Sequence, residues 1–397
     1  MYAGTDNLMF PLATQDRRGT VNPLILILFL TGLILLTFVL DFLTIQQMSL
    51  GLSSASDAAA LAAASTLMDD RALLNHPGLI AALYQDSQAE GRRYAVLNAP
   101  QGGRGFTIDS SNSIHVQLES SGNPDPMLLL PDRCRVTMYR TRATGNPVSL
   151  LLAPWLVSET VDIARQSLAS IERQIIGFDA TLNIAIPLAP IGILTDNSQQ
   201  RPDAWESQLA AGLTDDSAYD RISGQFFSHQ ADGLPELSFE LSTNCWPLAI
   251  GSHSSPESQL LNGVVQRDLI DFGGSLILSA TGPNLDLMNL DVDHRASLVQ
   301  GLNGLWQSAE ARIWPLAQTP AIDGLQAKIT GFIAARVVRI EAGTTPTPPT
   351  LTPSPSVNPS LRIVLQPTVM CTTTAVSSPM APEVPLNPFI ARIRLTR

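Results

Sequence analysis

Lysine is almost absent from this 397-residue sequence. Lys328 is the only lysine among 24 lysine and arginine residues, while aspartate and glutamate number 35, so the formal net charge is -11. A chain this acidic lacks the basic surface that binding to nucleic acid requires. The charge balance therefore argues against nucleic acid as a partner of the folded part.

Cysteine is also scarce, and the three cysteines lie far apart, at Cys134, Cys245 and Cys371. They form no C-x-x-C pair, which excludes a zinc-ribbon spacing and a disulfide-dense scaffold. An oxidising compartment would permit one disulfide and leave one thiol over. The sequence leaves the pairing open.

Catalytic and cofactor motifs are missing as well. The sequence contains no G-x-x-x-x-G-K-[ST], no G-x-G-x-x-G, no H-E-x-x-H and no G-x-S-x-G. The histidines lie far apart and none has metal-ligand spacing; they are His76, His115, His229, His253 and His294. We therefore expect a protein that is not an enzyme and has no cofactor, no metal site and no small-molecule substrate.

One long apolar run is present near the N-terminus. Residues 24–40 read LILILFLTGLILLTFVL, and apolar residues continue after Asp41 as far as Ile45. On an insertion scale this run contributes roughly -4 to -8 kcal/mol, whereas an aspartate costs about +3 kcal/mol at mid-membrane and less at the membrane edge. A helix over 22–45 is long enough to cross a hydrocarbon core of roughly 30 Å. The sequence therefore predicts a transmembrane helix, with the lipid bilayer as a partner.

The flanking residues favour a permanent anchor with its N-terminus in the cytoplasm. A signal peptide would have a shorter apolar core with a small-x-small site close behind it, but the first such triplet, Ala58–Ala60, lies far downstream. Arg17 and Arg18 precede the run, and the next basic residue is Arg71. The positive-inside rule then predicts a cytoplasmic tail over 1–21 and an extracytoplasmic, periplasmic region over 46–397, held in the inner membrane.

Beyond the apolar run, residues 46–70 are rich in alanine and leucine and contain no proline, which favours a helix. A second helix is predicted over 78–98, so 46–100 is expected to form a helical stalk. The small residues of 53–63 would let another backbone come close. That surface could pack on the chain's own domain or on another protein, and both interpretations stay open.

The N-terminal pattern resembles a known family. Its elements are a basic-Gly start, an apolar run that ends in aspartate, and the string Asp-Ala-Ala-Ala-Leu-Ala-Ala-Ala. This order is similar to the N-terminal module of the TadE/TadG-like pilus-assembly proteins of the tight-adherence (Flp pilus) systems. A weaker similarity to their large TadG-like members is carried by Arg92–Ala95, Gly145–Val148, Ala311–Leu316 and Thr330–Phe332. The residues that carry the resemblance are Arg17, Arg18, Gly19, Asp41, Asp57, Ala58, Ala59, Ala60, Leu61 and Ala62.

The resemblance implies a membrane-anchored component of a pilus-assembly or secretion apparatus, with pilus or secretion-system proteins as partners. Pseudopilins that a prepilin peptidase cleaves carry glutamate at the fifth residue after the cleavage-site glycine. Here Leu24 occupies the fifth position after Gly19. The departure favours a protein that is not processed and stays anchored.

The remaining chain mixes helix and strand patterns without regular βαβ units, which predicts an α+β fold. We expect an extracytoplasmic domain over 101–343, a Pro/Thr/Ser-rich loop over 344–360 and strands over 361–397 that complete the domain. Residues 161–175 fit both periods, and the resemblance favours a strand for their first half. Helices are expected at 204–213, 256–269 and 294–306, and strands at 106–108, 114–118, 135–139, 237–241, 275–280, 327–341, 361–370 and 389–395, with the first two forming a hairpin.

Two features leave other functions open. Residues Asp109–Ser113 fit D-x-S-x-S, a loop that binds a divalent cation in von Willebrand factor A domains, but no βαβ repeats follow, so we predict a turn. A bound cation there would instead favour an anchored ligand-binding or adhesive domain. A pocket that gathered Asp268, Asp271, Asp291 and Asp293 would favour an anchored hydrolase.

Overall fold

The computed structural model divides the chain into two compact units, one made of Met1–Leu50 with Arg140–Ile163 and the other of Gly51–Tyr139 with Ala164–Arg397. The predicted tail, with Arg17, Arg18 and Gly19, lies outside the described residues, as does the Pro-rich loop. The described residues are 23–100, 112–120, 130–150, 159–181, 184–196, 200–212, 214–278, 283–289, 291–319, 325–342, 361–378 and 385–396.

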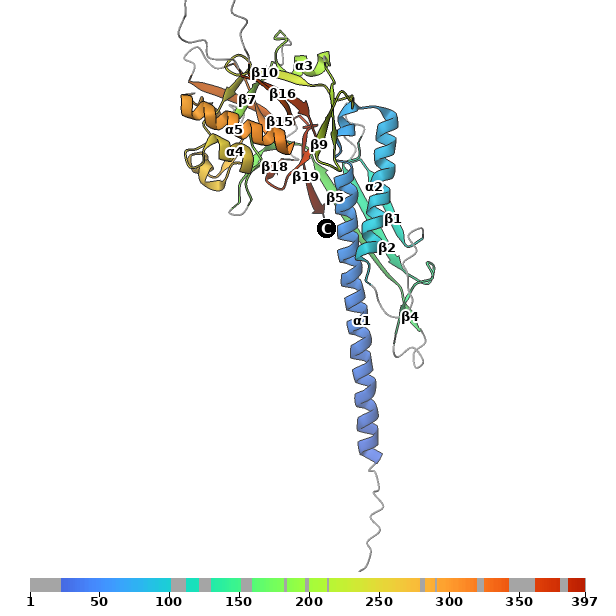
Figure 1. Ribbon diagram of the computed structural model, residues 1–397. Helices are drawn as coiled ribbons and strands as arrows, with labels where there is room; N and C mark the ends of the chain where they lie inside the picture. Colours follow the sequence, from blue (N-terminus) through green and yellow to red (C-terminus); the bar gives the residue numbers. More distant parts are fainter. Residues whose placement is uncertain are drawn as a thin grey trace, which may run out of the picture. The chain divides into compact units, whose positions relative to one another are not determined.

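Helix α1, Pro23–Thr66, is the long blue helix in Figure 1. Proline at its first position suits a helix start, and no proline follows to break it. Its apolar side chains up to Leu43 are largely exposed, with Phe29 at 70%. Within the described chain, α1 alone is long and apolar enough to cross a membrane, with a mean hydropathy of 2.8 over 18 residues, none of them buried. The predicted apolar helix is confirmed.

The first unit also contains a short antiparallel pair, β3 (Val148–Ser149) and β4 (Thr160–Val161). Its chain packs on α1, because Arg140 Nη1 lies 3.3 Å from Met48 Sδ. Arg140 Nε also donates to the Asn146 carbonyl at 3.2 Å. These contacts fix the segment after residue 140 against the helix.

In the second unit, the end of α1 is followed by a 3₁₀ turn, η1 (Asp70–Leu74), and by helix α2 (Pro77–Asn98). Figure 1 shows α2 beside this part of α1. Both helices accompany a five-stranded sheet. Its strands are, in spatial order, β1 (Ile114–Glu119), β2 (Arg133–Arg140), β5 (Ile163–Glu172), β19 (Ile390–Thr396) and β17 (Met370–Cys371).

Several predictions for this region are confirmed, and one stays untested. Helix α2 matches the expected 78–98, and residues 163–172 form a strand rather than a helix. Strand β1 was expected to pair with 106–108, which lies outside the described residues. Among the described residues β1 pairs with β2, with Val116 opposite Val136, and the expected hairpin with 106–108 stays a prediction.

A seven-stranded sheet forms the centre of the second unit. Strand β15 pairs on its two sides with β14 and β16, and also with β13. All pairs are antiparallel except β7 with β14. The strands are β10 (Leu237–Glu240), β16 (Leu361–Pro367), β15 (Gln326–Ala342), β14 (Arg312–Ala317), β7 (Ile191–Leu194), β11 (Cys245–Pro247) and β13 (Asn284–Asp286).

Smaller elements cover this sheet, and α5 contacts β15. Buried aromatic rings join the layers: Trp205 stacks on Phe239, and Phe178 meets Phe332 edge to face. The helices are α3 (Trp205–Ala211), α4 (Pro256–Asn262), η3 (Gln266–Phe272) and α5 (Val292–Ser308), and the strands are β6 (Ile175–Asp179), β8 (Ser217–Asp220), β9 (Gln225–Ser228), β12 (Ser275–Ile277) and β18 (Ala375–Ser377). The predicted mixture of helices and strands is confirmed as α+β.

Candidate functional site

The alanine-rich part of α1 packs against its own unit. Ala59, Ala60 and Ala63 have no exposed surface. A Cβ atom added at Gly91 of α2 would lie 3.1 Å from the Ala63 Cβ, and the Ser87 hydroxyl donates to the Ala63 carbonyl at 2.7 Å. The small residues therefore let α2 approach α1 closely, as they do in membrane helix pairs. Of the two interpretations left open by the sequence, packing within the chain is the one that the structure shows.

The aspartate of the alanine-rich string ties α1 to the sheet. The Ser167 hydroxyl, on β5, lies 2.7 Å from the Ser56 hydroxyl and donates to Asp57 Oδ1 at 2.5 Å. Ser56 and Ser167 are both buried. No local sequence signal links these residues, because 110 positions separate Asp57 from Ser167.

The segment directly after α1 carries a buried ion pair. Asp70 Oδ2 accepts from Arg336 Nη1 at 2.7 Å, and the side chains of both residues are about nine-tenths buried. Asp70 Oδ1 accepts from the Thr368 hydroxyl at 2.6 Å and from the Val369 amide at 2.7 Å. The Arg336 guanidinium also lies 3.8 Å from the centre of the Tyr219 ring, a cation–π contact. Asp70 therefore fastens the end of α1 to β15 and to the residues after β16.

Asp69 makes a second attachment at the same place. Its carboxylate accepts from Arg71 and, at 2.8 Å, from Arg221 Nη1, while Arg221 Nη2 donates to the Met68 carbonyl at 3.0 Å. Burial by itself would raise the pKa of Asp69, but hydrogen bonds from Arg71 and the charges of both arginines together lower it. The carboxylate is thus held ionised. We call residues 68–71, between α1 and α2, the junction.

Asp41 lies in the first unit, within the N-terminal part of α1. It is 6% exposed, whereas Phe42 and Leu43 beside it are 53% and 54% exposed. The carboxylate is therefore shielded on a helix whose other faces are open. This is the arrangement expected of a polar residue at the edge of an apolar span.

A shallow groove of about 760 Å³ runs between the outward faces of α1 and α2 in the second unit. Its lining includes the outward residues of the alanine-rich string, Ala58, Leu61 and Ala62. Acidic side chains of α2, Asp86 and Glu90, also line it. The string thus has two faces, one buried within the chain and one that borders an open groove.

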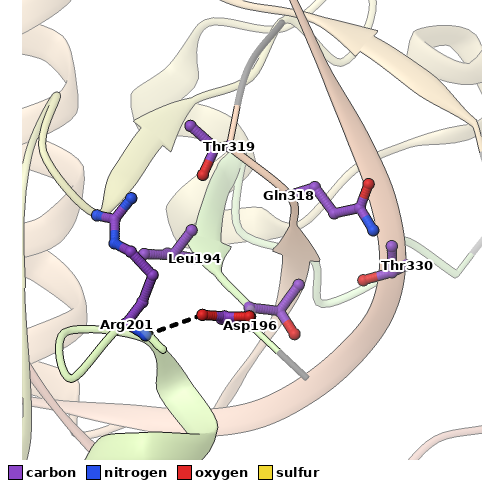
Figure 2. Close-up of a pocket in the computed structure, with 7 residues that line it drawn as sticks. Leu194, Asp196, Arg201, Gln318, Thr319 and Thr330 are labelled. Carbon is purple, nitrogen blue, oxygen red and sulfur yellow. Dashed lines mark hydrogen bonds between the residues drawn. The ribbon is translucent and has the colours of Figure 1, made fainter. Parts of the chain in front are cut away.

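A second hollow, of about 430 Å³, is polar and lies at the carboxyl ends of the parallel strands β7 and β14 (Figure 2). Asp196 Oδ2 accepts from the Arg201 amide at 2.9 Å, and the Asp196 amide donates to Glu206 Oε2 at 3.0 Å. We call this hollow the polar pocket. Its lining residues are Leu194, Thr195, Asp196, Arg201, Gln318, Thr319 and Thr330.

The residues of the hydrolase hypothesis line neither of these two hollows. Asp268 is buried and accepts from the amides of Ser254 and Val265, and Asp291 caps α5 by accepting from the His294 amide. Asp271 is exposed, as is Asp293. Two of the four carboxylates therefore stabilise local turns.

The other candidates lead to no metal centre. Residues 109–111 of the D-x-S-x-S loop lie outside the described residues, and Ser113 directly precedes β1. Within the described ranges, no group of three or more histidine, cysteine, aspartate or glutamate residues is placed to hold a metal ion. Cys134, Cys245 and Cys371 are all free thiols.

Comparison with protein-family models, with curated proteins and with solved structures finds no match to this chain.

Proposed function

We propose that this chain is a non-enzymatic, single-pass inner-membrane protein and a component of a tight-adherence (Flp) pilus assembly or secretion apparatus. The observation that carries the proposal is the division of α1. Its N-terminal part exposes apolar side chains of the kind that lipid covers, and its C-terminal part buries an alanine-rich string against a folded unit.

The hydrogen bonds and ion pairs at the C-terminal end of α1 support a role for this helix in anchoring a folded domain. Asp57, Asp69 and Asp70 each bond the helix or the junction to distant parts of the second unit. Such bonds hold the C-terminal part of α1 firmly within the second unit. The groove beside Leu61 offers a face on which a pilus or secretion-system protein would pack.

Topology is tested first, with a different tag at each end of the chain and protease added to intact spheroplasts. The proposal expects digestion of the C-terminal tag and protection of the N-terminal tag on a membrane-retained fragment. Release of the N-terminal tag from the mature protein would show that the apolar segment is a cleaved leader and would contradict the proposal.

The proposed contact with a pilus or secretion-system protein is tested by site-specific photocrosslinking in cells that express the pilus genes. A photoreactive residue at Leu61, in the groove, is compared with one at Ile222, which is 97% exposed on the turn between β8 and β9. The proposal expects crosslinks from position 61 to a pilus or secretion-system protein and few from position 222. Absence of such crosslinks from position 61, in membranes where the protein is inserted, would refute assembly through this face.

A further inference from the structure

We infer that the polar pocket at the ends of β7 and β14 is a binding site for a neutral, hydroxyl-rich ligand, a sugar unit of an envelope glycan. The inference rests on the proposed placement of this unit outside the membrane, but it does not require a pilus partner. It begins with position: the pocket lies where β7 and β14 run parallel, so both strands deliver the residues that follow them to one edge of the sheet. Its volume falls in the range of roughly 300–1,000 Å³ that small-molecule sites occupy.

Three side chains in the lining have hydrogen-bonding capacity to spare. Among the described residues, neither the Gln318 amide nor the Thr319 hydroxyl has a side-chain hydrogen-bond partner, and both residues are exposed. The Thr330 hydroxyl makes only a long bond, 3.4 Å, to the Leu316 carbonyl. Figure 2 shows Asp196 between Arg201 on one side and Gln318 with Thr330 on the other. The pocket therefore offers an amide and two hydroxyls beside a carboxylate.

The charges around the pocket disfavour an anionic ligand. Arg201, the one cationic side chain in the described lining, is engaged by Asp203 through two bonds, Nε to Oδ1 at 2.9 Å and Nη2 to Oδ2 at 2.7 Å. Glu206 accepts from the Thr195 hydroxyl behind the lining. One arginine thus stands against three carboxylates in or next to the lining: Asp196 and Asp203 act on Arg201 directly, and Glu206 bonds Thr195 and the Asp196 amide. An added anion would meet net negative charge.

A metal cation is disfavoured by the number of ligands. Asp196 supplies the only carboxylate in the lining, and one of its oxygens already accepts from the Arg201 amide. Divalent calcium takes six to eight oxygen ligands and usually several carboxylates. The pocket instead suits a neutral ligand.

Sugar hydroxyls match this set of groups because each hydroxyl both donates and accepts. A hydroxyl can donate to the Asp196 carboxylate, while a neighbouring hydroxyl pairs with the Gln318 amide, which also does both. The lining contains no aromatic ring on which a sugar face could stack. We therefore expect weak binding of a single sugar, with a Kd of about 1 mM.

The test uses the full chain in lipid nanodiscs, because the head group of an alkyl-glycoside detergent would itself compete as a sugar. The probes are glucose, galactose, mannose and N-acetylglucosamine, with acetate, sulfate and calcium chloride as charged competitors. Saturation-transfer NMR detects the bound sugar, and a titration gives its Kd. We expect a saturation-transfer signal for at least one of the sugars, and we expect none of the charged competitors to abolish that signal.

Two variants locate the binding. Gln318→Ala and Thr319→Ala remove groups that make no side-chain bond within the described protein, so folding is retained, and each should weaken sugar binding at least fivefold. Gln307→Ala, an exposed glutamine on α5, is the matched control and should leave the Kd unchanged. The inference would be overturned if no sugar gave a saturation-transfer signal. It would also be overturned if the two variants bound sugar as tightly as the unmodified protein, or if a charged competitor displaced the sugar.

Discussion

At the scale of single residues, the most consequential side chains are charged and buried. Asp70 satisfies both carboxylate oxygens with three donors from two distant segments, and Arg336 adds the face of Tyr219. Buried ion pairs of this kind contribute little net stability compared with apolar packing, but removing one partner leaves the other charge uncompensated. Replacing one partner therefore destabilises the fold by more than the ion pair itself contributes to the free energy of unfolding.

Asp70→Asn should lower the free energy of unfolding by roughly 3–5 kcal/mol, because Arg336 would stay buried without its counter-charge. The matched control is Asp86→Asn, whose exposed pair with Arg71 is about half accessible and should cost at most about 1 kcal/mol. Urea denaturation of the solubilised chain, followed by tryptophan fluorescence, measures both. Equal, small effects of the two substitutions would contradict the role assigned to Asp70.

The three cysteine thiols should differ in their reactivity toward an alkylating reagent. Burial raises the pKa of the Cys134 thiol to about 12, from an ordinary value of 9.0, and burial raises the pKa of Cys245 further. Desolvation also raises the pKa of the Cys371 thiol, but of the three cysteines only Cys371 is exposed. Because the thiolate is the reactive form and must be reached by the reagent, alkylation at pH 8 should modify Cys371 first and leave the other two intact until the protein unfolds. Mass spectrometry of the native and urea-unfolded chain checks this order, and rapid native modification of Cys134 would contradict it.

At the scale of elements, close helix packing depends on small side chains in one stretch of α1. Ala63 is fully buried against α2, with Gly91 opposite it, whereas its neighbour Ala62 lines the open groove. Two adjacent alanines of the same string therefore have different surroundings. The same substitution can therefore be made once at a buried alanine and once at an alanine that borders the groove, and the two effects can be compared.

Ala63→Leu should destabilise the fold by about 1–3 kcal/mol, because the added atoms have no space between α1 and α2. Ala62→Leu should change stability by no more than about 0.5 kcal/mol, since its side chain points into the groove. The free energy of unfolding is measured for both variants. If Ala62→Leu proved the more damaging, the assignment of the buried face would be wrong.

Many of the helices and strands were predictable from the sequence. The apolar and alanine-rich runs of α1, the helix α2 and the strands around 135–139 and 361–367 all follow from periodicity and composition. Strand pairing was not predictable: the pairing of β5 with β19, more than 200 positions later in the chain, has no local signal. Pairing is decided by which faces become buried together, and that information is spread along the whole chain.

The sites were less predictable than the elements. The family resemblance singled out Asp57, yet its partner Ser167 carries no sequence signal. Asp70 and Arg336 are likewise 266 positions apart. The polar pocket draws on segments near 195, 201, 318 and 330, and none of them contains a motif. Sites assembled from such distant segments are invisible to a motif search.

At the scale of the whole molecule, the proposed membrane attachment depends on the apolar part of α1. The run contributes roughly -4 to -8 kcal/mol to insertion, and an arginine at the helix centre costs about 2.5–3.5 kcal/mol. Replacing both Leu33 and Leu35 by arginine should therefore make insertion marginal. Alkaline carbonate extraction should release the double variant and retain the Gln47→Arg control; retention of both would contradict a lipid-spanning role for this segment.

The five-stranded sheet has a consequence for how the protein is made. Ser170 of β5 and Thr396 of β19 lie 2.8 Å apart although 226 positions separate them, and Val369 reaches Asp70 across 299 positions. In the topology proposed above, the alanine-rich string crosses the membrane before β19 and the residues after β16 have been made to cover it. Folding of contacts this distant is slow, and the uncovered helix is prone to aggregate meanwhile. We therefore expect newly exported chains to depend on an envelope chaperone until β19 has joined the sheet.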